Sequence, residues 1–115
     1  MLKGFILAVL AVLMTSTAFA DSTKTCKVLE TDGSVEVSVT VIDEATGKCV
    51  ISFSNDTNRN VNVRYVVKDN FSGNQLPGSC LVYANSETVK EVSFGTSVRT
   101  KNVFVSSVSG ERCQK

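Results

Sequence analysis

The chain of 115 residues contains no histidine, no tryptophan and a single proline, Pro77. Without histidine it lacks the base of a Ser-His-Asp triad or a Cys-His dyad, and no Ser-x-x-Lys or Gly-x-Ser-x-Gly motif replaces them. Zinc sites usually combine closely spaced cysteine pairs with histidine, and the cysteines here are 23, 31 and 33 residues apart. We therefore expect no enzyme, no cofactor and no metal site.

An excess of charge of one sign is also missing. Twelve Lys and Arg residues face eleven Asp and Glu residues, and the basic count falls to eleven once Lys3 is removed with the leader described next. The charges are scattered, with no basic run interleaved with aromatics. A phosphate backbone requires a basic patch, so nucleic acid is not an expected partner.

The one long apolar run lies near the start of the chain. Lys3 supplies a basic n-region, residues 5–14 an apolar h-region, and Ala18-Phe19-Ala20 a small-x-small cleavage pattern. This run is too short for a transmembrane helix, which needs about 20 apolar residues. Residues 1–20 are therefore predicted to be a signal peptide, and residues 21–115 a secreted or periplasmic domain with no membrane span.

Four cysteines remain in the mature chain, and an exported chain of this size gains stability from disulfides. Their even number predicts two bridges, among Cys26, Cys49, Cys80 and Cys113. Simple meander registers favour the pairing of Cys26 with Cys49 and of Cys80 with Cys113. The alternative, Cys26 with Cys113 and Cys49 with Cys80, remains open.

Alternation of apolar and polar residues predicts about seven short strands and no helix after the leader. The expected strands are residues 25–30, 34–42, 49–54, 61–68, 80–84, 88–94 and 103–108. Asp32-Gly33 favours a two-residue hairpin turn, which would place Cys26 opposite Val39. Residues 69–79 hold the only proline and much Gly and Asn, so we expect the longest loop there, crossing between sheets.

Residues 49–68 form the centre of this pattern, as two alternating runs joined by an Asn-rich turn. We expect seven of their side chains to be buried together: Cys49, Ile51, Phe53, Val61, Val63, Tyr65 and Val67. The stretch resembles the paired early strands of immunoglobulin-like and fibronectin-type-III-like domains of exported bacterial proteins, although the core Trp of true immunoglobulin domains is absent. The resemblance implies a small antiparallel β-sandwich of immunoglobulin-like type, and it carries no functional residues.

Three local motifs invite a chemical interpretation. Asp56, Asn58 and Asn60 have the spacing that opens a calcium loop, but Val61 and Val67 stand where that loop needs Gly and Glu, so ordinary turn chemistry is expected. Asn-x-Ser/Thr acceptor patterns begin at Asn55 and Asn70, and their use depends on the source. Asp43 and Glu44 are adjacent and are expected to be solvated turn charges.

A binding surface is the remaining functional hypothesis. Arginine and aromatic residues are enriched at binding hot spots. The candidate residues are Arg59, Arg64, Lys68, Phe71 and Tyr83, with the loop at residues 69–79 as the main part. The sequence thus predicts a non-catalytic binding or interaction module for a protein or a glycan, with a secreted inhibitor of a hydrolase, such as a protease or lysozyme, as the alternative.

Overall fold

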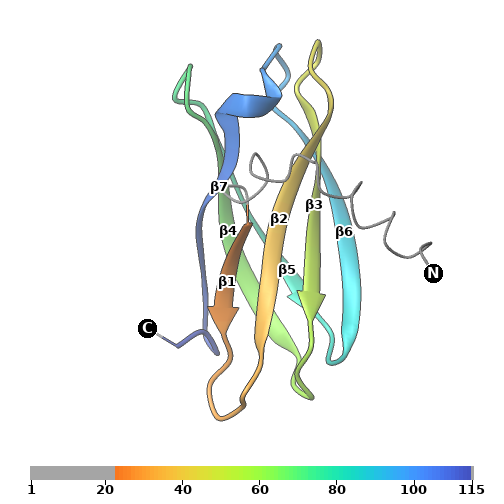
Figure 1. Cartoon of the computed structure of the whole chain (residues 1–115), viewed down its shortest axis with the longest axis vertical. Helices are drawn as coiled ribbons and strands as arrows, with labels where there is room; N and C mark the ends of the chain where they lie inside the picture. Colours follow the sequence, from red (N-terminus) through yellow and green to blue (C-terminus); the bar gives the residue numbers. More distant parts are fainter. Residues whose placement is uncertain (1–22, 115) are drawn as a thin grey trace, which may run out of the picture.

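The computed structural model describes residues 23–114, which form two antiparallel β-sheets that pack face to face (Figure 1). The predicted signal peptide lies outside the described residues. The strands are β1 (Thr23–Lys27), β2 (Ser34–Asp43), β3 (Lys48–Asn55), β4 (Val61–Asp69), β5 (Gln75–Val82), β6 (Ser86–Ser93) and β7 (Val103–Gly110), and a short 3-10 helix, η1 (Thr100–Asn102), precedes β7. None of the helices in this part of the chain has the length and apolar character needed to span a bilayer.

The predicted all-β architecture of about seven antiparallel strands is confirmed. One sheet has the order β1-β2-β3-β6 and the other β5-β4-β7, so the chain crosses between sheets after β3, after β5 and after β6. A constant-type immunoglobulin domain instead combines its first, second, fifth and fourth strands in one sheet. The likeness to that class therefore rests on the two-sheet architecture and strand number rather than on strand order.

The predicted core of residues 49–68 is confirmed, because all seven side chains are at most 2% exposed. Inward-facing residues alternate with outward-facing polar ones along β3 and β4, and the two strands lie in opposite sheets. Phe53 and Tyr65 meet across the interface with ring centroids 5.6 Å apart. The Asn-rich segment between β3 and β4 is therefore a connection between sheets and not a hairpin turn.

The register predicted for the first hairpin is wrong. Cys26 lies opposite Val35 instead of Val39, because the chain between β1 and β2 forms a longer turn than Asp32-Gly33 alone. In this turn Val28 N–H donates to the carbonyl of Gly33 at 3.1 Å, and Glu30 adopts a positive φ of 65°. The shift moves the first strand by four residues without changing which face Cys26 occupies.

The predicted loop at residues 69–79 is also wrong in extent. Asp69 ends β4 and residues 75–79 belong to β5, so only the tight turn at residues 70–74 separates two strands that pair as a hairpin within one sheet. Pro77 lies opposite Val66 in β5, an edge strand whose other side has no strand partner. Proline is tolerated at an edge because a missing N–H costs nothing on the unpaired side.

The favoured disulfide pairing is wrong, and one bridge is present where two were expected. Cys26 is disulfide-bonded to Cys113, with Cα atoms 5.1 Å apart. The two meet because the end of the chain returns beside β1, where Cys113 pairs with Val28 in an isolated antiparallel β-bridge. Cys49 and Cys80 are free thiols. Cys49 lies at the start of β3 between Val41 and Val92, whereas Cys80 lies near the end of β5 in the other sheet.

Candidate functional site

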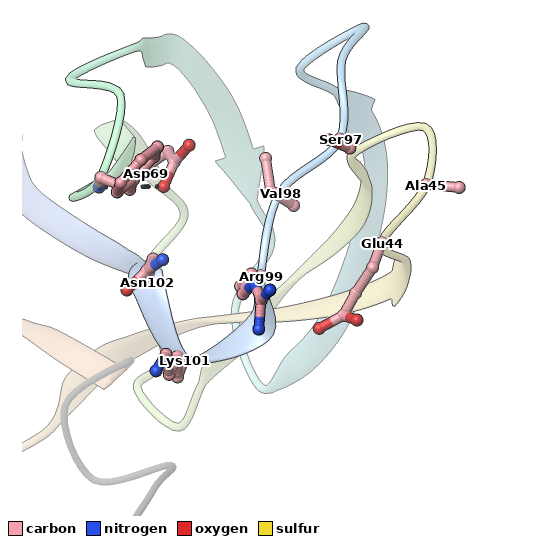
Figure 2. Close-up of a pocket in the computed structure, with 9 residues that line it drawn as sticks. Glu44, Ala45, Asp69, Ser97, Val98, Arg99, Lys101 and Asn102 are labelled. Carbon is pink, nitrogen blue, oxygen red and sulfur yellow. Dashed lines mark hydrogen bonds between the residues drawn. The ribbon is translucent and has the colours of Figure 1, made fainter.

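Three connections meet at the end of the sandwich that lies opposite the turn between β1 and β2. They are the β2–β3 turn, the β4–β5 turn, and the segment from the end of β6 to η1 (Figure 1). Between them is an open cleft of about 970 Å³, called the end cleft below. Its lining residues are Glu44, Ala45, Asp69, Phe71, Ser97, Val98, Arg99, Lys101 and Asn102 (Figure 2).

Asp69 organises the β4–β5 turn. Its side chain is buried, one carboxylate oxygen accepts a hydrogen bond from Phe71 N–H at 3.1 Å, and the other accepts from the Ser72 hydroxyl at 2.8 Å. Its main chain closes the same turn with Gly73 and Asn74. Aspartate side chains stabilise turns by such bonds to the backbone two residues on. The turn is consequently held in one shape with Phe71 at its tip, 86% exposed.

Glu44 joins the β2–β3 turn to the segment before β7. Its carbonyl accepts from Val98 N–H at 2.9 Å, and one carboxylate oxygen accepts from both the N–H and the hydroxyl of Thr100 at 2.8 Å. These hydrogen bonds, with a smaller contribution from the charge of Arg99, hold the pKa of Glu44 below its usual value. Glu44 is thus exposed in a turn, as expected, and it has the additional role of joining two loops.

Further hydrogen bonds complete this brace. Asn70 N–H donates to the carbonyl of Asn102 at 2.8 Å, and Phe94 N–H donates to the carbonyl of Gly47 at 3.0 Å. Gly47 is buried with a φ of 75°, and a Cβ there would collide with the carbonyl oxygen of Thr96. Only glycine readily adopts this positive φ and also has no Cβ to meet the Thr96 oxygen. The three loops are thus tied to one another.

Arg99 and Lys101 supply the positive charge of the end cleft. Both side chains are exposed, they flank Thr100, and Figure 2 draws Arg99 between Glu44 and Lys101. Within residues 23–114 neither cation has a carboxylate oxygen at ion-pair distance; the ion pair observed there joins Arg59 and Glu30 at 3.4 Å, away from this cleft. Their hydrogen-bond donors are therefore free for a ligand.

The five binding residues predicted from the sequence do not gather into one patch. Arg64 and Lys68 lie on the outward side of β4, and Phe71 stands at the end cleft. Arg59 and Tyr83 lie in connections at the other end of the sandwich. The nine residues of β4 separate these ends by roughly 26 Å, at about 3.3 Å per residue.

Sequence reasoning missed Glu44, Arg99 and Lys101 as members of a site. Arg99 and Lys101 lie on either side of Thr100, in the connection between the expected strands at residues 88–94 and 103–108. That spacing was visible, but nothing local shows that the segment lies beside the turns that follow β2 and β4. Proximity of three loops is set by strand order, which the sequence pattern does not report.

The Asn-rich segment after β3 uses its polar side chains for structure. Asn55 is buried, its amide donates to the carbonyls of Arg59 and Val82, and its oxygen accepts from the N–H and hydroxyl of Thr57. Asp56 accepts from Ser34 N–H, as expected of turn chemistry. In the folded chain the Asn55 amide is thus occupied, whereas Asn70 is exposed beside the end cleft.

A second, smaller groove of about 170 Å³ lies on the outer face of the four-stranded sheet, over Ser38, Ser52 and Ser54. Two carboxylates flank it, Glu36 and Glu87, both opposite Ser54 in the strand register. The described residues contain no group of three His, Cys, Asp or Glu side chains placed to hold a metal ion. The one aromatic residue that lines this groove, Phe53, is buried, whereas Phe71 of the end cleft is exposed.

The end cleft is therefore the candidate functional site: a braced set of loops presenting one exposed aromatic ring and two unpaired cations. Comparison of the chain with protein-family models, with curated proteins and with solved structures finds no matching family, relative or structure.

Proposed function

We propose that the protein is an exported, non-catalytic binding module with an immunoglobulin-like sandwich, and that its ligand occupies the end cleft. One observation carries the proposal. The side chains that fix the loops are Asp69, within the β4–β5 turn, and Glu44, between the β2–β3 turn and the segment before β7, and they are distinct from the aromatic and cationic side chains left for contact. A site whose framework and contact residues are separate can present its contacts in a fixed arrangement.

Preorganisation supports affinity because little conformational entropy is then lost on binding. Loops at one end of a rigid sandwich are the usual recognition elements of that architecture. The end cleft has the size range of small-molecule or oligomer sites, about 300 to 1,000 Å³, at its upper limit. A ligand there would meet side chains from three connections at once.

Export is supported by the predicted signal peptide and by the Cys26–Cys113 bridge, since disulfides persist in oxidising compartments. The non-catalytic assignment is supported by the chemistry of the cleft. A general acid needs a raised pKa, whereas hydrogen bonds from Thr100 lower that of Glu44. Asp69 uses both carboxylate oxygens to hold its own turn.

The test is an array of glycans and peptides probed with the mature chain, residues 21–115, and with a variant carrying F71A, R99A and K101A. No hydrogen bond or ion pair joins these three exposed side chains to another residue of the described chain, so circular dichroism should be unchanged. We expect the array to contain ligands that bind the wild type and do not bind the variant. Equal binding by both proteins would place the site elsewhere, and an array with no bound ligand would contradict the binding module.

A second function, inhibition of a secreted hydrolase, is favoured by the exposed position of Phe71 on its braced turn. A rigid turn with an aromatic tip can fill a specificity pocket without being distorted. Turnover by a panel of proteases and lysozymes should then fall on addition of the wild type and recover with F71A. Full turnover throughout the panel would contradict inhibition and leave the binding module as proposed.

A further inference from the structure

The two cations of the end cleft retain most of their hydrogen-bonding capacity. A guanidinium carries five N–H donors and an ammonium three. For Arg99 and Lys101 no hydrogen bond to a described residue is observed from either side chain, and neither forms an ion pair within residues 23–114. Anionic oxygens are the partners that such donors bind most strongly.

The carboxylates of the cleft do not compete effectively for these donors. Asp69 is buried and bonded at both oxygens, to Phe71 N–H and the Ser72 hydroxyl. Glu44 directs one oxygen to two donors of Thr100. An incoming anion therefore competes with one unbonded carboxylate oxygen, the second oxygen of Glu44, which forms no ion pair with either cation within residues 23–114.

Phe71 adds an apolar contact to this charge. Its ring is 86% exposed although Asp69 fixes the backbone that carries it. The C–H face of a pyranose ring packs favourably on an aromatic face, and the hydroxyl groups at its edge suit the neutral side chains of Ser97 and Asn102, which also line the cleft. A sugar that also bears a carboxylate would use both kinds of contact.

A peptide is a poorer fit to the same site. Extended peptides bind by adding a strand to an exposed sheet edge, where unpaired main-chain groups give the affinity. In the end cleft the main-chain N–H groups of Asn70, Val98, Thr100 and Asn102 are already bonded within the loops. Few main-chain donors of the cleft therefore remain for a peptide, and recognition here relies mainly on side chains, as it does for glycans.

From this geometry we propose that the end cleft binds a carboxylated oligosaccharide, with Arg99 and Lys101 binding its carboxylates and Phe71 packing against a sugar ring. This inference rests on the proposed binding function and specifies its ligand class. Because the cations are exposed, affinity should decrease as salt concentration increases.

The experiment is isothermal titration of the mature chain with an oligogalacturonate and with the same oligomer fully methyl-esterified, which keeps the rings and removes the charge. We expect binding of the acidic oligomer and at least tenfold weaker binding of the ester. R99A/K101A should weaken binding of the acidic oligomer at least tenfold, and F71A about fivefold. The matched control R64A/K68A removes the same charge from the outer face of β4 and should change affinity less than twofold.

Four results would overturn the inference. If R64A/K68A weakens binding as much as R99A/K101A does, the attraction is non-specific. Equal binding of the ester would show that carboxylates are not recognised, and tighter binding of poly-glutamate than of the sugar would identify a peptide site. Absence of any binding to the acidic oligomer also rejects the ligand class. The proposed function fails separately, and only if no ligand on the array described above binds the wild type more strongly than the triple variant.

Discussion

Removing the Cys26–Cys113 bridge should strongly destabilise this domain. The bridge closes a loop with a sequence separation of 87 residues. In the chain-entropy model a loop of this length contributes about 4.6 kcal/mol by restricting the unfolded chain. Domains have about 5 to 15 kcal/mol in total, so the loss in C26A/C113A corresponds to between about a third and nearly all of the free energy of unfolding.

The bridge also acts where the sheets have little else to join them at this edge. It connects β1 of the four-stranded sheet to the segment after β7 of the three-stranded sheet, beside main-chain hydrogen bonds from Leu29 to Arg112 and from Gln114 to Lys27. Without the covalent link these hydrogen bonds alone would hold the C-terminal end of the chain beside β1. Chain ends fray unless they are tied down.

Urea unfolding followed by circular dichroism measures the effect. With a denaturant dependence of about 1.5 kcal/mol per molar urea, a loss of about 4.6 kcal/mol lowers the midpoint by about 3 M. Reduction of the wild type by dithiothreitol should give the same midpoint as C26A/C113A. Added reductant should leave the midpoint of C26A/C113A unchanged, because no second bridge remains to be broken.

Two results would refute this reasoning. A loss below about 1 kcal/mol would show that the bridge does not constrain the unfolded chain as the loop length requires. A further destabilisation of C26A/C113A by reductant would reveal a bridge between Cys49 and Cys80. Thiol titration is the independent check: the unfolded, unreduced wild type should show two thiols, and the folded protein should react slowly because burial raises the pKa of both.

Two further perturbations test the loops. The variant E44Q should be less stable than the wild type at pH 7: the folded-state pKa of Glu44 lies below its ordinary 4.5, so its contribution is complete above that value and is lost as the pH falls through the folded-state pKa. The gap in urea midpoint between the two proteins should be larger at pH 7 than at pH 3, and an equal gap at both would contradict the charge interaction. The variant N55A should lose about 2 to 4 kcal/mol in urea unfolding, because the hydrogen bonds of the buried Asn55 side chain to the carbonyls of Arg59 and Val82 and to Thr57 are lost, whereas N58A at an exposed position should stay within about 0.5 kcal/mol. Equal effects of the two alanines would show that the Asn55 bonds do not contribute.

Part of the end cleft was accessible to sequence reasoning. Phe71 was identified as an aromatic residue in a turn region, and it does stand exposed at the tip of a turn. Its neighbours Arg99 and Lys101 are about thirty residues further along the chain, in a segment with no distinguishing composition. Residue type could indicate each of them as a binding residue, but only the strand order shows that they share a cleft.

By itself the sequence determined the strands and the faces of those strands. The alternation of residues 49–68 decides which side chains leave water, because successive side chains of a strand point to opposite faces. That rule is local, and it correctly placed Cys49, Phe53 and Tyr65 in the core. The predicted leader and the even cysteine number likewise depend on composition and not on folding.

Only the tertiary structure decided which strands pair, which cysteines bond and which loops meet. Pro77 suggested a loop because proline removes a main-chain donor, yet the edge position of β5 makes that loss harmless. Cys26 could join any of three partners until the chain end was seen to return beside β1. These choices depend on packing one sheet against the other, which involves residues far apart in the chain and leaves no periodic signal in it.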